Sequence, residues 1–577
     1  MGMRWRNGSK RGLPLGVLYL AGLALAATPG CSGSVGSSSG DFGNGGNAAG
    51  GNSVGGNAGA RPGGNAGTVA VSDAPGVLPM RLLTRVEYDN TIFDLLGDNS
   101  HPASAFPTED AANTGFAQVQ KLDEVNVNAY LKAAEIIAEK AATDLKAFMG
   151  CDPAGANELT CVKSFVNTFG RKAYRRPLKT AEVDEHVAFF RDTMRGTLKL
   201  PVNEAVVTLT TAMLQSPFFL YRWEGAWEAM KDGNALRLNP HHLASQLSYF
   251  LWASMPDAEL SKAADGDQLK TTAQIEAQVQ RLLSDPRAQR MVSNFVEQWL
   301  GVSALPGALR SKAGWSKELA SAMVEEANRF AGDIILRGDG KMKTLFTSRQ
   351  SSANGTLAAF YGDKTITGTV AKPLTFPDGQ RAGILTLAAP LAAHSVESEP
   401  SPILRGKFIR ERIMCEHLPP PPGGVPDLPP PDPNTTKKDR FAMHAKGTCA
   451  GCHALMDPIG FGFENYDNVG SYRTMDGKFV VDSKGTIAGL DEQDKSFNSA
   501  IDMMTLLSES NQVRACLIKQ FFRYAVARKE NDGDAKVLAD ALTGLTTSDS
   551  NLKKLLVNMA TSKVLTHRTL AIEEVLP

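Results

Sequence analysis

The sequence predicts a mainly α-helical protein of several domains, preceded by a disordered tether. Its 577 residues exceed what a single hydrophobic core normally holds, so we expect several domains. Apolar residues repeat at helical spacing in several segments after residue 78. Residues 32–77, in contrast, are mainly Gly, Asn, Ser and Ala, and they cannot bury enough apolar surface to offset the entropy of ordering. This Gly/Asn/Ser-rich stretch is therefore predicted to be a flexible linker.

The clearest helical segments share apolar residues spaced three and four apart. In 286–300, for example, Phe295 and Trp299 lie on one face, and Gly301 ends the segment. The predicted helices cover residues 85–96, 123–148, 286–300, 316–336, 511–528 and 549–565. Residues 338–380 lack this spacing and are richer in Gly, Thr and Ser, so we expect loops and short strands there.

Residues 1–31 are typical of an export signal. A basic start precedes the apolar run 13–27, which is short for a membrane span. Cys31 follows this run and resembles the lipidated first residue of a bacterial lipoprotein, which is the interpretation we favour. Cleavage near Ala26, which would leave a soluble secreted protein, is the alternative. We therefore expect an outer-membrane lipoprotein of a Gram-negative bacterium, and otherwise a periplasmic or secreted protein.

The most informative pattern in the chain is a Cys-x-x-Cys-His motif formed by Cys449, Cys452 and His453. Two thiols one helical turn apart can form thioethers with the vinyl groups of a porphyrin, and the adjacent imidazole then ligates the iron. The sequence therefore predicts covalent haem c on Cys449 and Cys452, with His453 as an axial ligand of the haem iron. A proline-dominated stretch, 418–433, predicts a stiff spacer before this segment.

Other uses of the cysteine pair fit the sequence less well. A thioredoxin-like disulfide needs a preceding strand, but residues 437–447 are polar and predict none. A zinc site usually needs two such pairs, and the sequence contains one. Three acidic residues follow, Asp457, Glu464 and Asp467, but a calcium site would need more oxygen ligands. We assign these carboxylates to helix capping and hydrogen bonds around the haem loop, and we expect the second ring nitrogen of the histidine to donate to a carbonyl or carboxylate.

The sixth ligand of the iron stays unresolved in the sequence. Met456 lies only three residues after His453, so we expect it to pack beside this histidine rather than to reach the opposite face. The candidates for the opposite face are His444, Met475, Met503 and Met504. A strong ligand there would make an electron-transfer protein, whereas an open position would permit the chemistry of a haem oxidoreductase.

The remaining cysteines fit an oxidising compartment. Cys151 and Cys161 flank residues typical of a turn, which predicts a local disulfide. For Cys415 and Cys516 two interpretations remain equally open, a disulfide by default and two buried free thiols.

Five motifs follow one another after the linker. They start at Arg81, Phe169, Leu247, Arg381 and Phe521 and read RLLTRVEY, FGRKAYRRPL, LSYFLW, RAGIL and FFRYA. In this order they resemble planctomycete- and myxobacterial-type secreted proteins built from domains of unknown function. The resemblance implies domains like DUF1587 at 78–148, DUF1595 at 150–226, DUF1592 at 236–364, DUF1588 with the haem motif at 378–480, and DUF1585 at 495–570. It also implies a helical scaffold with a C-terminal cytochrome c-like haem segment, but no specific reaction.

Composition narrows the choice of partners. The 61 Lys and Arg residues balance 61 Asp and Glu residues, and no basic stripe suggests nucleic-acid binding. We expect an envelope-associated c-type haem protein in electron transfer or haem-linked redox chemistry, with a redox partner protein or a small-molecule substrate and with membrane contact through the N-terminal lipid. Whether it is an enzyme is left open. The alternative is a cell-surface binding or structural lipoprotein whose haem is not catalytic, because burying a haem takes only about a hundred residues.

Overall fold

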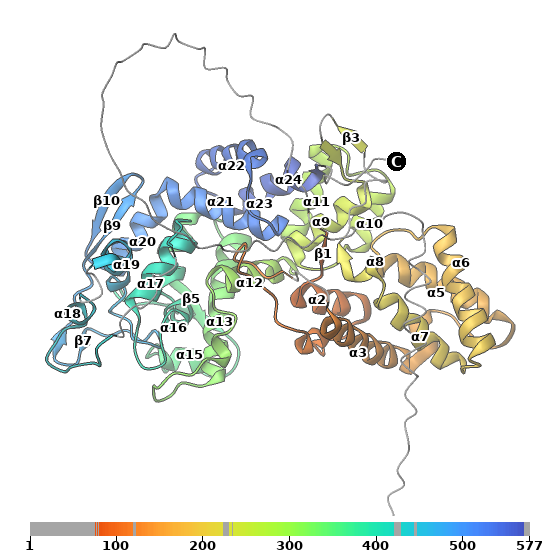
Figure 1. The fold of residues 1–577 in the computed structure, drawn as a ribbon, viewed down its shortest axis with the longest axis horizontal. Helices are drawn as coiled ribbons and strands as arrows, with labels where there is room; N and C mark the ends of the chain where they lie inside the picture. The colour runs from red at the N-terminus through yellow and green to blue at the C-terminus, as the bar shows by residue number, and fades with distance from the viewer. Residues whose placement is uncertain are drawn as a thin grey trace, which may run out of the picture. The chain divides into compact units, whose positions relative to one another are not determined.

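The computed structural model describes residues 76, 78, 80–118, 123–222, 230–232, 235–419, 428–442 and 447–569. Helices dominate these residues and the strands are short, which confirms the predicted mainly α-helical fold (Figure 1). The export signal with Cys31, most of the linker 32–77, His444 and residues 420–427 of the proline-rich stretch lie outside the described residues. Within the described ranges, no helix is both long and apolar enough to cross a membrane.

The N-terminal helices enclose a hydrophobic core of their own. They are α2 (Arg85–Leu96), α3 (Glu124–Ala141), α4 (Leu145–Met149), α5 (Glu158–Ala173), α6 (Thr180–Ala188), α7 (Val202–Leu214) and α8 (Pro217–Leu220). Tyr88, Phe165 and Phe219 are among the aromatic side chains fully buried in this core. Strands β1 (Arg81–Leu82) and β2 (Tyr221–Arg222) pair antiparallel and so bring the two ends of this part together.

Helix α2 begins and ends where the sequence predicts. The hydroxyl of Thr84 accepts a hydrogen bond from the backbone N–H of Glu87, and the carboxylate of Glu87 accepts one from the backbone N–H of Thr84. This capping box satisfies two backbone donors that the helix itself leaves unpaired. Gly97, with φ 72°, ends the helix in the left-handed conformation that glycine adopts without strain.

The single helix predicted for 123–148 is wrong. The chain leaves α3 after Ala141, makes a short turn and restarts as α4. Asp144 begins α4, because its side chain accepts a hydrogen bond from the backbone N–H of Ala147 and thereby favours a new helix start over continuation. A disulfide between Cys151 and Cys161, whose Cα atoms lie 5.8 Å apart, closes the loop that follows.

A second and larger core extends from α9 to the end of the described chain. Its first elements are α9 (Pro240–Trp252), α10 (Ala258–Asp265), α11 (Thr272–Ser284), α12 (Ala288–Trp299), α13 (Lys317–Gly332), α14 (Met342–Thr347), α15 (Gly355–Phe360) and α16 (Ala388–Ala393). Strands β5 (Gln350–Ala353) and β6 (Lys372–Thr375) pair antiparallel within 338–380, where short strands were expected. The short helices α14 and α15 in the same stretch were not predicted, because six residues are too few for a helical period to stand out.

The C-terminal part contributes the rest of this core. Its helices are α17 (Pro402–Phe408), α18 (Lys437–Phe441), α19 (Ala450–Phe461), α20 (Ala500–Glu509), α21 (Asn511–Val526), α22 (Ala535–Thr547), α23 (Leu552–Thr561) and α24 (Lys563–Thr566). Two antiparallel hairpins lie between α19 and α20: β7 (Met475–Asp476) with β8 (Phe479–Val480), and β9 (Gly485–Leu490) with β10 (Gln493–Phe497). Strand β11 (His567–Arg568) joins β4 (Ala235–Arg237), which also pairs with β3 (Met230–Asp232).

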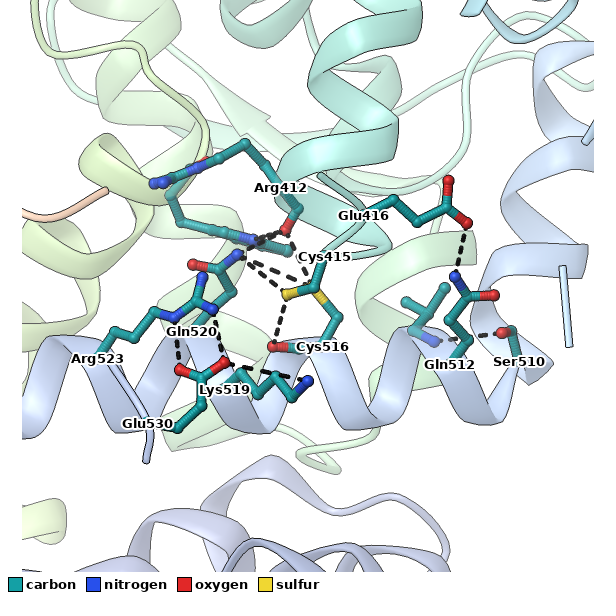
Figure 2. The surroundings of a disulfide bond; sticks show 12 residues. Arg412, Cys415, Glu416, Ser510, Gln512, Cys516, Lys519, Gln520, Arg523 and Glu530 are labelled. Carbon is teal, nitrogen blue, oxygen red and sulfur yellow. Dashed lines mark hydrogen bonds and ion pairs between the residues drawn. A yellow bond between two sulfur atoms is a disulfide. The ribbon is translucent and has the colours of Figure 1, made fainter. Parts of the chain in front are cut away.

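A second disulfide ties the end of the α17 segment to α21 (Figure 2). Cys415 and Cys516 are 101 residues apart in sequence, and their Cα atoms lie 5.2 Å apart. Beside the bond, the side-chain amide of Gln520 donates to the backbone carbonyl of Arg412 at 3.1 Å. The pairing that the sequence left open is therefore formed in the structure.

Helix α13 carries a carboxyl group into the core. Glu326 is fully buried, and its two oxygens accept hydrogen bonds from the hydroxyl of Ser351 at 2.7 Å and from that of Tyr361 at 2.6 Å. Burial raises the pKa of Glu326 from 4.5 to about 7, although the hydroxyl of Tyr361 partly opposes this shift.

This raised pKa predicts a pH-dependent contribution to stability. Between pH 4.5 and about 7 the native protein holds a proton on Glu326 that the unfolded chain has lost, so this contribution is present below that window and falls as the pH rises through it. We expect the free energy of unfolding of the wild type to fall by about 3 kcal/mol relative to that of Glu326→Gln as the pH rises across this range. Chemical denaturation of both proteins at several pH values measures this change. Parallel curves for the two proteins would contradict the assignment.

Candidate haem centre

The Cys-x-x-Cys-His motif lies at the start of α19. Cys449 ends a short 3-10 turn and directly precedes the helix, while Cys452 and His453 stand in its first turn. The spacing of three residues places the two thiols near one another on the helix surface. Both cysteines are half-buried and outside any disulfide, whereas His453 is buried. The two thiols are thus accessible for covalent attachment beside an imidazole that solvent barely reaches.

The carboxylate of Asp457 orients the imidazole of His453. The Nδ1 atom of His453 lies 2.9 Å from Oδ2 of Asp457, one helical turn further along α19, and both residues are buried. A hydrogen bond from Nδ1–H to the carboxylate leaves the lone pair on Nε2, the ring nitrogen that would ligate an iron. This contact confirms the expectation that the second ring nitrogen donates to a carbonyl or a carboxylate.

The position of α19 is set by a close crossing with α17, its neighbour in Figure 1. A Cβ atom at Gly406 on α17 would overlap the backbone carbonyl of Met456, and one at Gly460 on α19 would overlap that of Pro402. Glycine at these two positions therefore lets the two backbones touch. On another side of α19, a Cβ atom at Gly485 of β9 would overlap the carbonyl of Pro458. Helix α19 is held by direct backbone contacts on more than one side.

A buried guanidinium fixes the turn that follows α19. Arg405, on α17, is only 2% exposed, and burial lowers the pKa of its guanidinium to about 10. Its NH groups donate to the carbonyl oxygens of Leu391, Phe463, Tyr466 and Asp467 and to the hydroxyl of Ser395, over 2.6–3.1 Å. The charge is thereby compensated mainly by backbone dipoles, and the chain is clamped directly after the haem helix.

The acidic residues after the motif act as hydrogen-bond acceptors, as predicted. Besides Asp457, Asp467 accepts hydrogen bonds from the backbone N–H groups of Val469 at 3.0 Å and Ser471 at 2.9 Å, which shapes the loop. Glu464 is buried, and its Oε2 accepts a hydrogen bond from Arg473 at 2.9 Å. In the described part of the chain, no three His, Cys, Asp or Glu side chains converge to hold a metal ion.

The candidates for the sixth ligand occupy different environments. Met456 is buried within α19 itself, where the sequence placed it on the proximal side. Met503 and Met504 are fully buried on α20 and belong to the large hydrophobic core. Met475, on β7, is exposed to 46%. Core packing accounts for the two methionines of α20, and none of these residues is assigned as a ligand.

The residues of the motif fit the group that the sequence implies. Covalent haem c needs two unpaired thiols at this spacing, an adjacent imidazole and a partner that orients it. Cys449 and Cys452 supply the thiols, His453 supplies the imidazole, and Asp457 supplies the orienting carboxylate. The motif was recognised in the sequence, but the specific role of Asp457 was not. Its spacing of four residues after the histidine, which places both on one face of a helix, could have indicated this role.

The glycine crossing predicts a selective loss of stability. Gly406→Ala adds a methyl group that meets backbone rather than a flexible side chain, so the two helices must separate. We expect the free energy of unfolding in chemical denaturation to fall by about 1–3 kcal/mol. Gly307→Ala is the matched control, because a Cβ atom there has no neighbour within 4 Å. Equal stability of Gly406→Ala and the control would contradict the close crossing.

Comparison with family models finds five matches in chain order, each described as a protein of unknown function. They are DUF1587 at 81–143, DUF1595 at 161–224, DUF1592 at 238–362, DUF1588 at 381–476 and DUF1585 at 493–565. The DUF1588 model, which has the short name PSCyt3, covers the Cys-x-x-Cys-His motif. Neither a search of curated proteins nor a search of solved structures gives a match. The chain belongs to the multi-domain proteins that combine DUF1587, DUF1595, DUF1592, DUF1588 and DUF1585.

Proposed function

We propose that this protein is an envelope-associated c-type haem protein that takes part in electron transfer or haem-linked redox chemistry. The observation that carries the proposal is the arrangement of Cys449, Cys452 and His453 at the start of α19, with the imidazole hydrogen-bonded to Asp457. The short name PSCyt3 of the matching family model agrees with a cytochrome-like segment. A covalently held haem would supply one-electron chemistry at its iron.

The chain itself would anchor and orient this group. The thiols of Cys449 and Cys452 would each form a thioether, and His453 would ligate the iron through Nε2. Because Asp457 accepts a hydrogen bond from Nδ1 of His453, the imidazole is a more basic ligand than it would be next to a neutral acceptor. The contacts of α17 with α19 would hold His453 in place beside the bound group.

Export is part of the same proposal. The two disulfides, Cys151–Cys161 and Cys415–Cys516, are typical of proteins that mature in an oxidising compartment. We propose lipid attachment at Cys31, with a redox partner protein or a small-molecule substrate as the functional partner. The balance of 61 basic and 61 acidic residues gives no reason to propose a nucleic-acid partner.

A second candidate function is favoured by a separate feature of the fold. A large cavity is lined by residues on either side of the motif in sequence, and its described lining does not include the motif residues. A cell-surface binding protein whose haem is not catalytic would explain this cavity. The ligand that it would take is considered in the next subsection.

The primary test is the covalent attachment of haem. The full chain should be produced with a c-type haem maturation system and examined by mass spectrometry and by optical spectroscopy, oxidised and reduced, with and without cyanide. We expect a haem adduct on the peptide that contains Cys449 and Cys452, and its loss when both cysteines are replaced by alanine. The variant Cys151→Ala with Cys161→Ala is the matched control and should keep the haem.

The spectra distinguish an electron-transfer protein from a haem oxidoreductase. A low-spin spectrum that cyanide leaves unchanged indicates a sixth protein ligand and favours electron transfer. A high-spin component that cyanide removes indicates an open position and favours an oxidoreductase. If the mature protein carries no covalent haem under competent maturation, the proposal is wrong.

The role of Asp457 gives an independent prediction. Asp457→Asn keeps the shape of the side chain but replaces a charged hydrogen-bond acceptor by a neutral one, which makes His453 a weaker electron donor to the iron. We therefore expect a higher reduction potential in spectroelectrochemical titration, with haem attachment retained. Asp439→Asn, at an exposed residue of α18, is the control and should leave the potential unchanged. A potential that does not rise in Asp457→Asn would contradict the orienting role.

A further inference from the structure

A large cavity lies beside the segment that follows the Cys-x-x-Cys-His motif. Its volume is about 1040 Å³, and residues of 311–312, 398–400, 431–440, 461–482 contribute to its lining. Binding sites for small molecules commonly measure roughly 300–1,000 Å³, so this cavity is large enough for a molecule of several rings. The lining that the structure describes contains none of Cys449, Cys452 and His453. The cavity is therefore a site separate from the candidate haem centre.

The charges that line this cavity nearly cancel. Six Lys and Arg side chains and seven Asp and Glu side chains contribute to it. Most of them form close pairs, for example Arg440 with Glu399 at 2.6 Å and Lys438 with Asp482 at 2.6 Å. A lining of alternating, paired charges gives no strong field for a cation or for an anion. It offers instead many hydrogen-bond donors and acceptors side by side.

One cation in the lining, Lys437, makes only long contacts with carboxylates. The ammonium of Lys437 lies 3.5–4.0 Å from the carboxylates of Glu399, Glu464 and Asp476. Each of these carboxylates already has a closer arginine partner. For Glu464 and Asp476 the partner is Arg473, which donates hydrogen bonds of 2.9 and 2.6 Å.

Lys437 therefore has donors that the described structure leaves unused. No hydrogen bond from its ammonium forms within the described residues, although the side chain is only 12% exposed. A nearly buried ammonium without hydrogen bonds is costly unless a bound molecule or water accepts from it. Lys437 lines the cavity, so a molecule bound there could supply acceptors for its ammonium.

The acceptor beside it is also incompletely used. Glu464 lines the cavity with its side chain 6% exposed, and its Oε1 has no hydrogen-bond partner among the described residues. Phe461 and Phe479 add aromatic surface to the same lining. The lining residues thus include an ammonium that makes only long contacts, a solvent-shielded carboxylate oxygen without a described hydrogen-bond partner, and aromatic rings.

We propose that this cavity binds a neutral polyhydroxylated molecule, that is, a saccharide. A hydroxyl group both donates and accepts, so vicinal hydroxyls can accept from the ammonium of Lys437 and donate to neighbouring carboxylates. The C–H faces of a sugar ring can lie against Phe461 or Phe479. A metal ion fits poorly because an ammonium already stands among the carboxylates, and an anion fits poorly because the lining carries seven carboxylates against six cations.

Calorimetric titration tests the proposal. The mature full-length protein is titrated with cellohexaose, maltohexaose and chitohexaose, and separately with the anionic polymers polygalacturonate and heparin. We expect saturable binding of at least one neutral hexasaccharide that changes little between low and high salt. Sedimentation with insoluble cellulose and chitin distinguishes a polymer of a cell wall from a soluble oligosaccharide as the source of the hydroxyl groups, and binding in either form supports the proposal.

Variants localise the binding. Lys437→Met keeps the aliphatic length of the side chain, and every neighbouring carboxylate retains its arginine, so the protein should fold. We expect about tenfold weaker binding, because a charged donor is lost. Lys343→Met, at an exposed side chain on α14, is the matched control and should bind like the wild type. Phe479→Ala, in the cavity lining, provides a second test if Lys437→Met does not fold.

Three results would overturn the proposal. The first is the absence of binding to every neutral probe at millimolar concentration. The second is binding only to the anionic polymers with loss at high salt, which would indicate a general electrostatic surface. The third is binding that Lys437→Met and Phe479→Ala leave unchanged, which would place the saccharide elsewhere on the protein. Because none of these readouts depends on haem, their failure is distinct from a failure of haem attachment.

Discussion

The contact between the backbones of α17 and α19 is the constraint on which the candidate haem centre depends. A helix of the Cys-x-x-Cys-His type has only one short face for its cofactor, so the remaining faces must be held by protein. Here Gly406 and Gly460 allow the two backbones to touch, and the neighbouring Arg405 clamps the turn after α19. The position of His453 is therefore fixed by residues that lie well before it in the chain.

The same stretch connects the haem segment with distant parts of the protein. Beyond α17, Arg412 donates to the carbonyl oxygens of Gly115 at 2.8 Å and Gln298 at 2.9 Å. Three residues later, Cys415 is bonded to Cys516 on α21. Residues 402–415 thus make contacts with the N-terminal part, with α12 and with the C-terminal helices. The DUF1592, DUF1588 and DUF1585 segments accordingly share one core, and the DUF1587 and DUF1595 segments share another, so the five domains are not separately packed modules.

The sequence was informative for most elements whose controlling interaction is local. The capping box at Thr84, the glycine stop at Gly97 and the apolar face of α12 all act within a few residues, and each element formed where it was expected. The haem motif is local in the same sense, and so is the spacing of Asp457 from His453. The break at Asp144 was missed because an aspartate in an otherwise helical pattern is compatible with both a surface position and a helix start.

The remaining features depend on contacts between residues far apart in sequence. The acceptors of Arg405 are mostly backbone carbonyls some sixty positions away. Every residue has a backbone carbonyl, so the sequence does not indicate which ones accept. The three carboxylates near Lys437 each have a closer arginine partner, and the sequence does not show these pairings. The partner of Cys415 likewise could not be derived, because the separation of two cysteines in sequence does not say which thiols the fold brings within bonding distance.

The disulfides and free thiols described above determine which cysteines must be oxidised and which must stay reduced during maturation. Four cysteines must be oxidised, across separations of 10 and 101 residues, while Cys449 and Cys452 stay reduced. A pair only three positions apart meets far more often than a distant pair, so an unprotected chain in an oxidising compartment would join the wrong sulfurs first. Under the proposed haem attachment, maturation would therefore need a reductant for Cys449 and Cys452, together with an oxidant for the other four cysteines.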